Sequence, residues 1–173
     1  MSIATSIPVE EYLRTSYSPD MEYVDGELVE INVGECGHSL VQRNVVTAFT
    51  VKYPSVFAVP EIRSRVLATR YRLPDVAVVL KPPRGRVLEE APFIVIEILS
   101  EDDRLGRVID KLHEYATKGV PNIWVFDPRP KRIFIFRDKA LQELQNDVIA
   151  TENPRLELTR EEIFRDVDVE PVD

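Results

Sequence analysis

The segment Pro92-Phe-Ile-Val-Ile-Glu-Ile-Leu99 decides the fold. Apolar side chains occupy both sets of alternating positions in it, which is typical of a central strand that is covered on both faces. Apolar residues at helical spacing, followed by Gly119 as a stop, predict a helix over 105–118 directly after this strand. A further apolar strand is expected at 122–126. Together, the three elements predict a parallel strand–helix–strand crossover.

On the N-terminal side the sequence predicts a hairpin, helices and several strands. Asp25-Gly26 separates two strand-like runs and favours a tight turn, because both central residues need positive φ. Apolar residues at helical spacing predict a helix over 38–52, and Ser6 is expected to cap a short helix over 7–13. The other expected segments are strands at 56–59, 62–68, 73–80 and 132–137, loops at 34–37 and 81–86, an edge strand near 144–150, and a helix over 159–164.

These elements fit a single α/β domain over residues 1–173, built as a mixed sheet flanked by helices. A chain of 173 residues suits one domain and can bury a substantial core. We expect the core to span about 10–165 and the tail, 167–173, to fray.

The charge of the chain bears on its partners. Thirty acidic and 22 basic residues give a net charge of −8. A negative field repels nucleic acid at long range, but screening confines it to about 8–10 Å at ordinary salt. The composition therefore counts against DNA binding unless a local basic patch overrides it.

The sequence carries no sign of export or membrane insertion. Residues 1–10 lack a basic region followed by an apolar core, and the longest apolar stretch, 93–99, is far shorter than the ~20 residues of a membrane span. The single cysteine, Cys36, allows no disulfide within the chain, which is compatible with a reducing compartment. We therefore expect a cytoplasmic protein.

Two acids, Asp75 and Glu97, form the constellation that carries chemistry. Asp75 opens a predicted strand after Pro74, and Glu97 lies inside the apolar central strand. A carboxylate in such a strand is costly to bury unpaired, so it needs a cationic partner, a metal or an open sheet face. Two acids that meet across adjacent strands repel each other, and a divalent cation that prefers oxygen ligands, Mg²⁺ or Mn²⁺, relieves both.

Lys111 lies on the helix that leaves the Glu97 strand, and the short connection limits how far this helix strays. The lysine could orient or deprotonate a water, or stabilise charge on a phosphate. Plainer interpretations stay open: Asp75 as a cap at a strand start, Glu97 as the partner of an arginine, and Lys111 as a solvated helix residue. Tyr115, four residues after Lys111, is expected to pack in the core.

At these residues the sequence resembles the PD-(D/E)XK nuclease pattern, with Pro74-Asp75 followed by a strand that ends Ile96-Glu97-Ile98. Longer motifs resemble the Uma-two family, a bacterial group of restriction-endonuclease-like proteins, over nearly the whole chain. These motifs lie at 23–30, 37–39, 94–100, 103–105, 110–116 and 118–128.

The resemblance implies a restriction-endonuclease-like core, hydrolysis of DNA phosphodiester bonds, a divalent metal held by Asp75 and Glu97, and a homodimer or higher homo-oligomer. The nuclease pattern has a lysine two residues after the glutamate, where this chain has Leu99. The Uma-two family is thought to supply the lysine from the next helix, which implies Lys111 as the catalytic lysine here.

Nucleases of this superfamily often carry a further acid on an early element, for which Glu27 and Glu30 are the candidates. Strand parity places these two on opposite faces, so at most one should reach the site. His38 is expected to contact a phosphate or a water on the metal, although its place at a helix start is equally compatible with a surface position.

The basic cluster of the sequence lies between residues 63 and 86. Arg63, Arg65 and Arg72 are the candidate phosphate contacts, because they precede Asp75 closely and Arg63 and Arg65 share one face of a predicted strand. The alternative is that these arginines pair with acids elsewhere in the chain.

Three functions fit these observations. The first is a metal-dependent DNA endonuclease, which should bring Asp75, Glu97 and Lys111 into one open cleft with basic walls. The second is a nuclease-fold protein that binds or regulates with little or no cleavage; its pocket should be closed, or Lys111 diverted to a salt bridge. The third is a hydrolase of RNA or smaller phosphoesters. A fold alone does not separate them.

Overall fold

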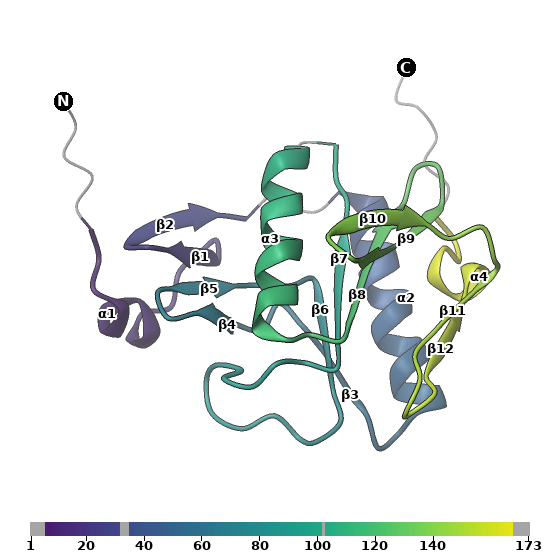
Figure 1. The fold of residues 1–173 in the computed structure, drawn as a ribbon, viewed down its shortest axis with the longest axis horizontal. Coiled ribbons are helices and arrows are strands. Elements are labelled where there is room, and N and C mark those ends of the chain that lie inside the picture. The colour runs from purple at the N-terminus through teal and green to yellow at the C-terminus, as the bar shows by residue number, and fades with distance from the viewer. Residues whose placement is uncertain (1–5, 32–34, 102, 168–173) are drawn as a thin grey trace.

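The computed structural model describes residues 6–31, 35–101 and 103–167 (Figure 1). Within these ranges the helices are α1 (Val9–Arg14), α2 (Cys36–Lys52), α3 (Leu105–Lys118) and α4 (Arg160–Ile163). The strands are β1 (Met21–Val24), β2 (Glu27–Glu30), β3 (Phe57–Pro60), β4 (Ser64–Leu67), β5 (Arg70–Arg72), β6 (Val76–Val79), β7 (Ile94–Ile98), β8 (Asn122–Asp127), β9 (Arg132–Arg137), β10 (Ala140–Glu143), β11 (Val148–Ala150) and β12 (Glu157–Thr159). None of the helices described is long and apolar enough to cross a membrane.

A six-stranded sheet in the order β10-β9-β8-β7-β6-β3 forms the centre of the fold. β7 and β8 are parallel, and α3 joins them as the predicted crossover. Every residue of β7 is buried, because α2 covers one face of the sheet and α3 covers the other (Figure 1). The predicted architecture, a mixed sheet flanked by helices, is confirmed.

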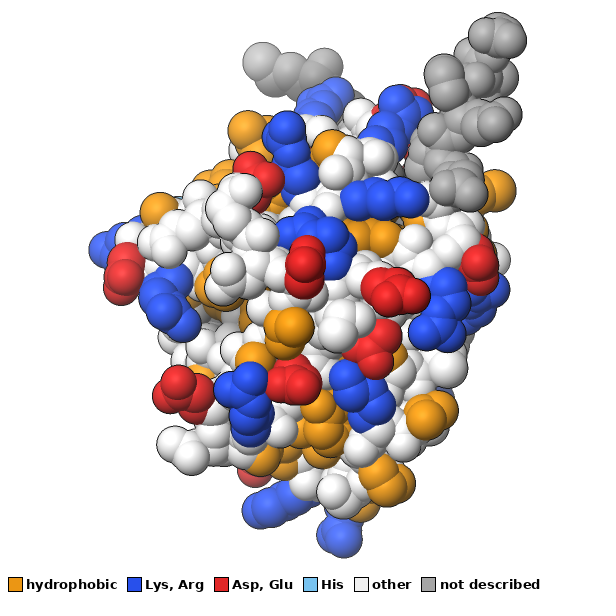
Figure 2. All heavy atoms as spheres, turned by 90° about the vertical axis from the view of Figure 1, so that its right-hand side faces the viewer, with side chains coloured by type: hydrophobic (Ala, Val, Ile, Leu, Met, Phe, Trp, Pro, Cys, Tyr) orange, Lys and Arg blue, Asp and Glu red, His pale blue; other side chains and the backbone are white. Residues whose placement is uncertain are grey.

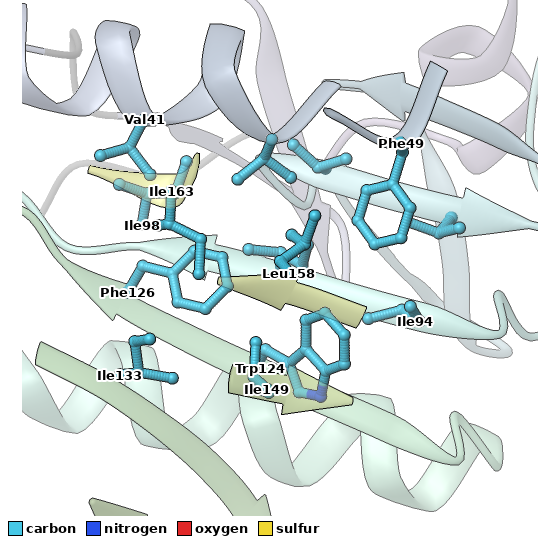
Figure 3. Close-up of a cluster of buried hydrophobic side chains, with 14 of the residues drawn as sticks. Val41, Phe49, Ile94, Ile98, Trp124, Phe126, Ile133, Ile149, Leu158 and Ile163 are labelled. Atoms are coloured by element: carbon cyan, nitrogen blue, oxygen red, sulfur yellow. The ribbon is translucent and has the colours of Figure 1, made fainter. Parts of the chain in front are cut away.

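The two faces of β7 carry different side chains. Ile94, Ile96 and Ile98 belong to the apolar cluster on the α2 side, together with Trp124. Figure 3 labels Ile94, Ile98 and Trp124 in this cluster. Val95 belongs to the second apolar cluster, which includes side chains of α3. Since side chains alternate along a strand, Glu97 projects to the α3 side as Val95 does.

A second sheet, in the order β2-β1-β5-β4, contains the predicted hairpin. β1 and β2 pair across Asp25 and Gly26, whose φ angles of +50° and +97° suit a tight hairpin turn. Tyr23 of β1 lies opposite Tyr71 of β5, and both rings pack against Tyr12 of α1. One face of this sheet is therefore an aromatic cluster.

The other face of the same sheet is charged. Glu22 precedes Tyr23, and Arg70 and Arg72 flank Tyr71, so alternation turns these three charged side chains away from the tyrosines. Both arginines reach the carboxylate of Glu114 on α3. Helix α3 thus packs its apolar side on the large sheet and pairs charges with the small one.

Several predicted ends were wrong. Pro8 is the N-cap of α1 and no side chain caps this helix, so Ser6 is not its cap. α2 begins at Cys36, within the loop predicted at 34–37, of which residue 34 lies outside the described residues. Val167 is buried in the core rather than frayed; 168–173, like 1–5, lie outside the described residues.

The short strands were the least predictable elements. β5, β10 and β12 have three or four residues each, and only the last three residues of the strand predicted at 144–150 form one, β11. Such segments are too short to show a hydrophobic period, and they become strands because a neighbouring strand pairs with them.

Truncation of Ile96 tests the central place of β7. Ile96 is fully buried, so Ile96→Ala is expected to lower the free energy of unfolding by about 2–5 kcal/mol through lost contacts and a cavity. Val51→Ala on α2 is the control, because Val51 is 75% exposed and its loss should change stability by less than about 0.5 kcal/mol. Chemical denaturation followed by circular dichroism measures both variants. Equal losses of stability in the two variants would contradict the position of β7 at the centre of the sheet, with a helix packed on each face.

Candidate active site

A pocket of about 300 Å³ opens where β6 and β7 meet α3, the β1–β2 hairpin and the start of α2. The titratable residues that line it include Glu22, His38, Asp75, Glu97, Arg107 and Lys111. The three residues predicted to carry the chemistry, Asp75, Glu97 and Lys111, therefore share one pocket.

The pairing of β6 with β7 brings the two acids together. These strands are antiparallel with Val76 opposite Ile96, so continuing the register by one residue sets Asp75 opposite Glu97. Asp75 Oδ2 accepts a hydrogen bond from the backbone N–H of Ile98 at 2.6 Å, and Oδ1 lies 3.1 Å from His38 Nε2. The carboxylate of Asp75 thus ties β6 to β7 and also faces the pocket.

Glu97 has two partners on α3. Tyr115 donates its hydroxyl to Oε1 at 2.6 Å, and Lys111 donates to Oε2 at 2.9 Å. Burial raises the pKa of Glu97 above its usual range; the Lys111 ammonium opposes this shift and the charge of Asp75 adds to it. Tyr115 is a core residue, as predicted, but its hydroxyl also orients Glu97, which the sequence analysis missed.

Lys111 lies between two carboxylates. Its ammonium is 2.9 Å from Glu97 and 3.1 Å from Glu22, and the side chain is 16% exposed. Burial alone would lower the pKa of Lys111, but Glu22 and Glu97 outweigh burial and raise it above its usual value. Lys111 is therefore an ammonium ion at neutral pH.

Glu22 is the acid of the hairpin that the sequence analysis overlooked. Its carboxylate accepts from Arg72 Nη1 at 2.9 Å and from the backbone N–H of Leu73 at 3.1 Å, besides pairing with Lys111. Burial raises the pKa of Glu22, but Lys111 and Arg72 outweigh burial and lower it. The signal that could have found it is the alternation of β1, where a charged Glu22 precedes Tyr23.

The two candidate acids on this hairpin, Glu27 and Glu30, differ in their position relative to the pocket. Glu30 lines the pocket, whereas Glu27 does not, in agreement with the expected difference in face. His38, at the start of α2, lines the pocket and contacts Asp75. Burial lowers the pKa of His38, but the hydrogen bond to Asp75 and the charges of Asp75, Asp103 and Glu97 together outweigh burial and raise it.

The candidate phosphate contacts are engaged with the protein. Arg63 donates to the carbonyl oxygens of Tyr12 and Thr15 and stacks on the Tyr12 ring, 4.4 Å from its centre. Arg65 pairs with Glu89 and does not line the pocket. The structure therefore does not bring Arg63 and Arg65 to the site.

Arg72 does reach the pocket, but it is buried among acids. It donates to both oxygens of Glu114, at 2.6 and 2.9 Å, and to Glu22. Arg72 therefore follows the alternative interpretation of the arginine cluster, in which the arginines pair with acids of the chain.

On the face of the molecule that contains α4, basic and acidic side chains are interspersed (Figure 2).

The site and its neighbours hold an excess of negative charge. In the described part of the chain, the pocket is lined by three permanent cations, Arg72, Arg107 and Lys111, and by seven acidic residues, Glu22, Glu30, Glu61, Asp75, Glu97, Asp103 and Asp110. A protonated His38 would offset one of the four surplus acidic residues. Among the described residues, no three His, Cys, Asp or Glu side chains are arranged to hold a metal ion. Asp75 and Glu97 are the pair that could hold one together with water.

Replacement of Arg72 tests whether these buried charges depend on one another. Arg72→Met would leave Glu22 and Glu114 with fewer cationic partners in a buried place, so we expect a loss of about 3–5 kcal/mol in the free energy of unfolding. Arg132→Met, at a side chain that is 55% exposed, should change stability by less than about 0.5 kcal/mol. Urea denaturation at neutral pH measures both, and a similar small loss in the two variants would speak against the network.

Comparison with known proteins places this chain in a family. The model of the Uma2 (Uma-two) family, described as "Putative restriction endonuclease", matches residues 9–168. A crystal structure described as that of "a putative nuclease belonging to DUF820" from Anabaena variabilis ATCC 29413 is similar, with a TM-score of 0.75 and 22% sequence identity. The alignment covers 91% of this chain and 97% of that chain, so the two share a fold. The comparison with curated proteins gave no match. Since the family model spans all but the ends of the chain, the chain belongs to the Uma2 family of restriction-endonuclease-like proteins.

Proposed function

We propose that this protein is a metal-dependent endonuclease that hydrolyses DNA phosphodiester bonds, with Asp75 and Glu97 as metal ligands and Lys111 as the assisting cation. The observation that carries the proposal is the meeting of these three side chains in one open pocket, although they come from three different elements. Membership of a family described as "Putative restriction endonuclease" supports it.

The residues present suit a hard divalent cation. Asp75 and Glu97 supply oxygen ligands from adjacent strands, and Mg²⁺ is commonly held by one or two carboxylates, water and substrate phosphate. Each carboxylate already accepts two contacts, but a carboxylate offers about four lone-pair positions, so acceptor capacity remains. The surplus of negative charge around the pocket also favours a cation there. Mn²⁺, which prefers the same ligands, would serve equally.

The chemistry divides between the cation and the side chains. When bound, a divalent cation lowers the pKa of a water ligand and neutralises charge on the phosphate. Tyr115 holds Glu97, and the Ile98 N–H and His38 hold Asp75, so both ligands are fixed before substrate arrives. Lys111 remains an ammonium between Glu22 and Glu97; it therefore stabilises the negative charge that develops on the phosphate rather than accepting a proton.

A binding protein without efficient cleavage is the second candidate, and two observations favour it. Lys111 is paired with Glu22 as well as with Glu97. The pocket walls are also less basic than expected of a nuclease, because Arg72, Arg107 and Lys111 are the only Lys or Arg residues that line it in the described part of the chain. Measured cleavage decides between the two candidates.

Cleavage of supercoiled plasmid at low salt, with Mg²⁺ or Mn²⁺, tests the proposed reaction. Nicking by the wild type is expected to disappear on addition of EDTA. Glu97→Gln and Lys111→Ala should each lower the rate by about 10²–10³-fold, because each removes a group that acts on the transition state. Glu27→Gln is the control, since it makes the same change of side chain as Glu97→Gln at a residue of β2 that does not line the pocket.

Two results would count against this reaction. Absence of cleavage on duplex DNA, single-stranded DNA and RNA, with all variants folded by circular dichroism, would favour the binding protein. Cleavage that persists in EDTA would exclude the metal mechanism.

Removal of the Tyr115 hydroxyl tests the support of Glu97. Tyr115→Phe takes away the donor to Oε1 while keeping the buried ring, and loss of such a supporting group typically costs about 10–100-fold in metal affinity or activity. Tyr53→Phe is the control, because its hydroxyl contacts the backbone of Glu157 on β12. Mn²⁺ titration by calorimetry and the plasmid assay measure both variants. Equal metal affinity in the two would show that Tyr115 serves packing alone.

A further inference from the structure

We infer that Arg107 binds a second phosphate of the nucleic-acid strand, at the mouth of the pocket and next to the phosphate that is cleaved. The inference rests on the proposed function in that it takes nucleic acid as the occupant of the pocket. It concerns a residue of α3 outside the group formed by Asp75, Glu97 and Lys111.

Arg107 is the one cation of the pocket that has no partner within the described ranges of the chain. Of the three Lys and Arg residues that line it within the described ranges, Arg72 is held by Glu22 and Glu114, and Lys111 is held by Glu22 and Glu97. The guanidinium of Arg107 makes no ion pair or side-chain hydrogen bond with any other residue that the structure describes. Its binding capacity is therefore available to a ligand.

The position of Arg107 on α3 sets its place relative to the reacting atoms. It lies four residues before Lys111, so both share one face of the helix and are separated by about 6 Å along its axis. Arg107 is exposed and Lys111 is 16% exposed, which places Arg107 nearer the opening. An extended strand whose cleaved phosphate lies at Lys111 would pass Arg107 with a neighbouring phosphate.

The charges around Arg107 favour a role in binding a phosphate. Glu30, Glu61 and Asp110 also line the pocket, and each repels a phosphate backbone. Two cations four residues apart on a helix repel each other as well, and among the residues that the structure describes no carboxylate pairs with Arg107 to offset this. A phosphate would relieve the repulsion, and arginine suits it because its planar group can bind two phosphate oxygens at once.

The test measures binding separately from cleavage. Binding of a fluorescein-labelled 20-base-pair duplex is followed by anisotropy in EDTA over a series of salt concentrations, and cleavage is measured in Mg²⁺. Arg107→Gln is expected to bind roughly tenfold more weakly, and the slope of log affinity against log salt should fall by about 0.9, the value for one phosphate contact. In cleavage, KM should rise while kcat is largely kept. Arg107→Lys should recover most of the affinity.

Arg137→Gln is the matched control. Arg137 is exposed at the end of β9, and the pairing of Asp127 with Arg132 puts this end opposite the one near the pocket. Its loss should leave affinity and salt slope unchanged. The inference is overturned if Arg107→Gln behaves like Arg137→Gln, if the wild type binds no DNA, or if kcat falls with KM unchanged. Binding that depends on Arg107 without any cleavage would refute the proposed reaction and keep the phosphate contact.

Discussion

The ammonium of Lys111 between Glu22 and Glu97 is the interaction on which the rest of the structure depends. It joins three elements at one point: the hairpin strand β1, the central strand β7 and the helix α3. Each of the three charges is nearly buried, so removal of any one leaves the others without full compensation. The small sheet, the large sheet and α3 are therefore held in one arrangement by charge as well as by packing.

The two faces of β7 have different roles in this arrangement. The α2 side is wholly apolar, where Ile94, Ile96 and Ile98 pack with Trp124. The α3 side is apolar near the start of the strand and ionic near its end, at Glu97. A rigid apolar layer behind a polar end is a common way to position reactive groups, because the strand cannot move without breaking its own core.

The acidic composition and the family membership can be reconciled by considering where the charges lie. A net charge of −8 gives the chain no general attraction to DNA. The buried acids near the pocket are largely paired with Arg70, Arg72 and Lys111, and the remaining surplus of acidic residues includes the proposed metal ligand Asp75. The proposed metal would reduce this surplus of negative charge and, with it, the local repulsion of a phosphate.

The sequence by itself determined the architecture and the main acids of the site. The apolar run around Glu97, the crossover to β8 and the Asp25-Gly26 turn are local patterns, and local patterns reflect the periods of strands, helices and turns. Only the tertiary structure decided that Glu22 rather than Glu27 or Glu30 pairs with Lys111, and that Arg72 serves buried acids rather than the solvent-facing pocket wall. The physical reason is that an ion pair depends on distances between residues far apart in the chain. These distances are set by how the two sheets pack on α3, and no sequence spacing contains them.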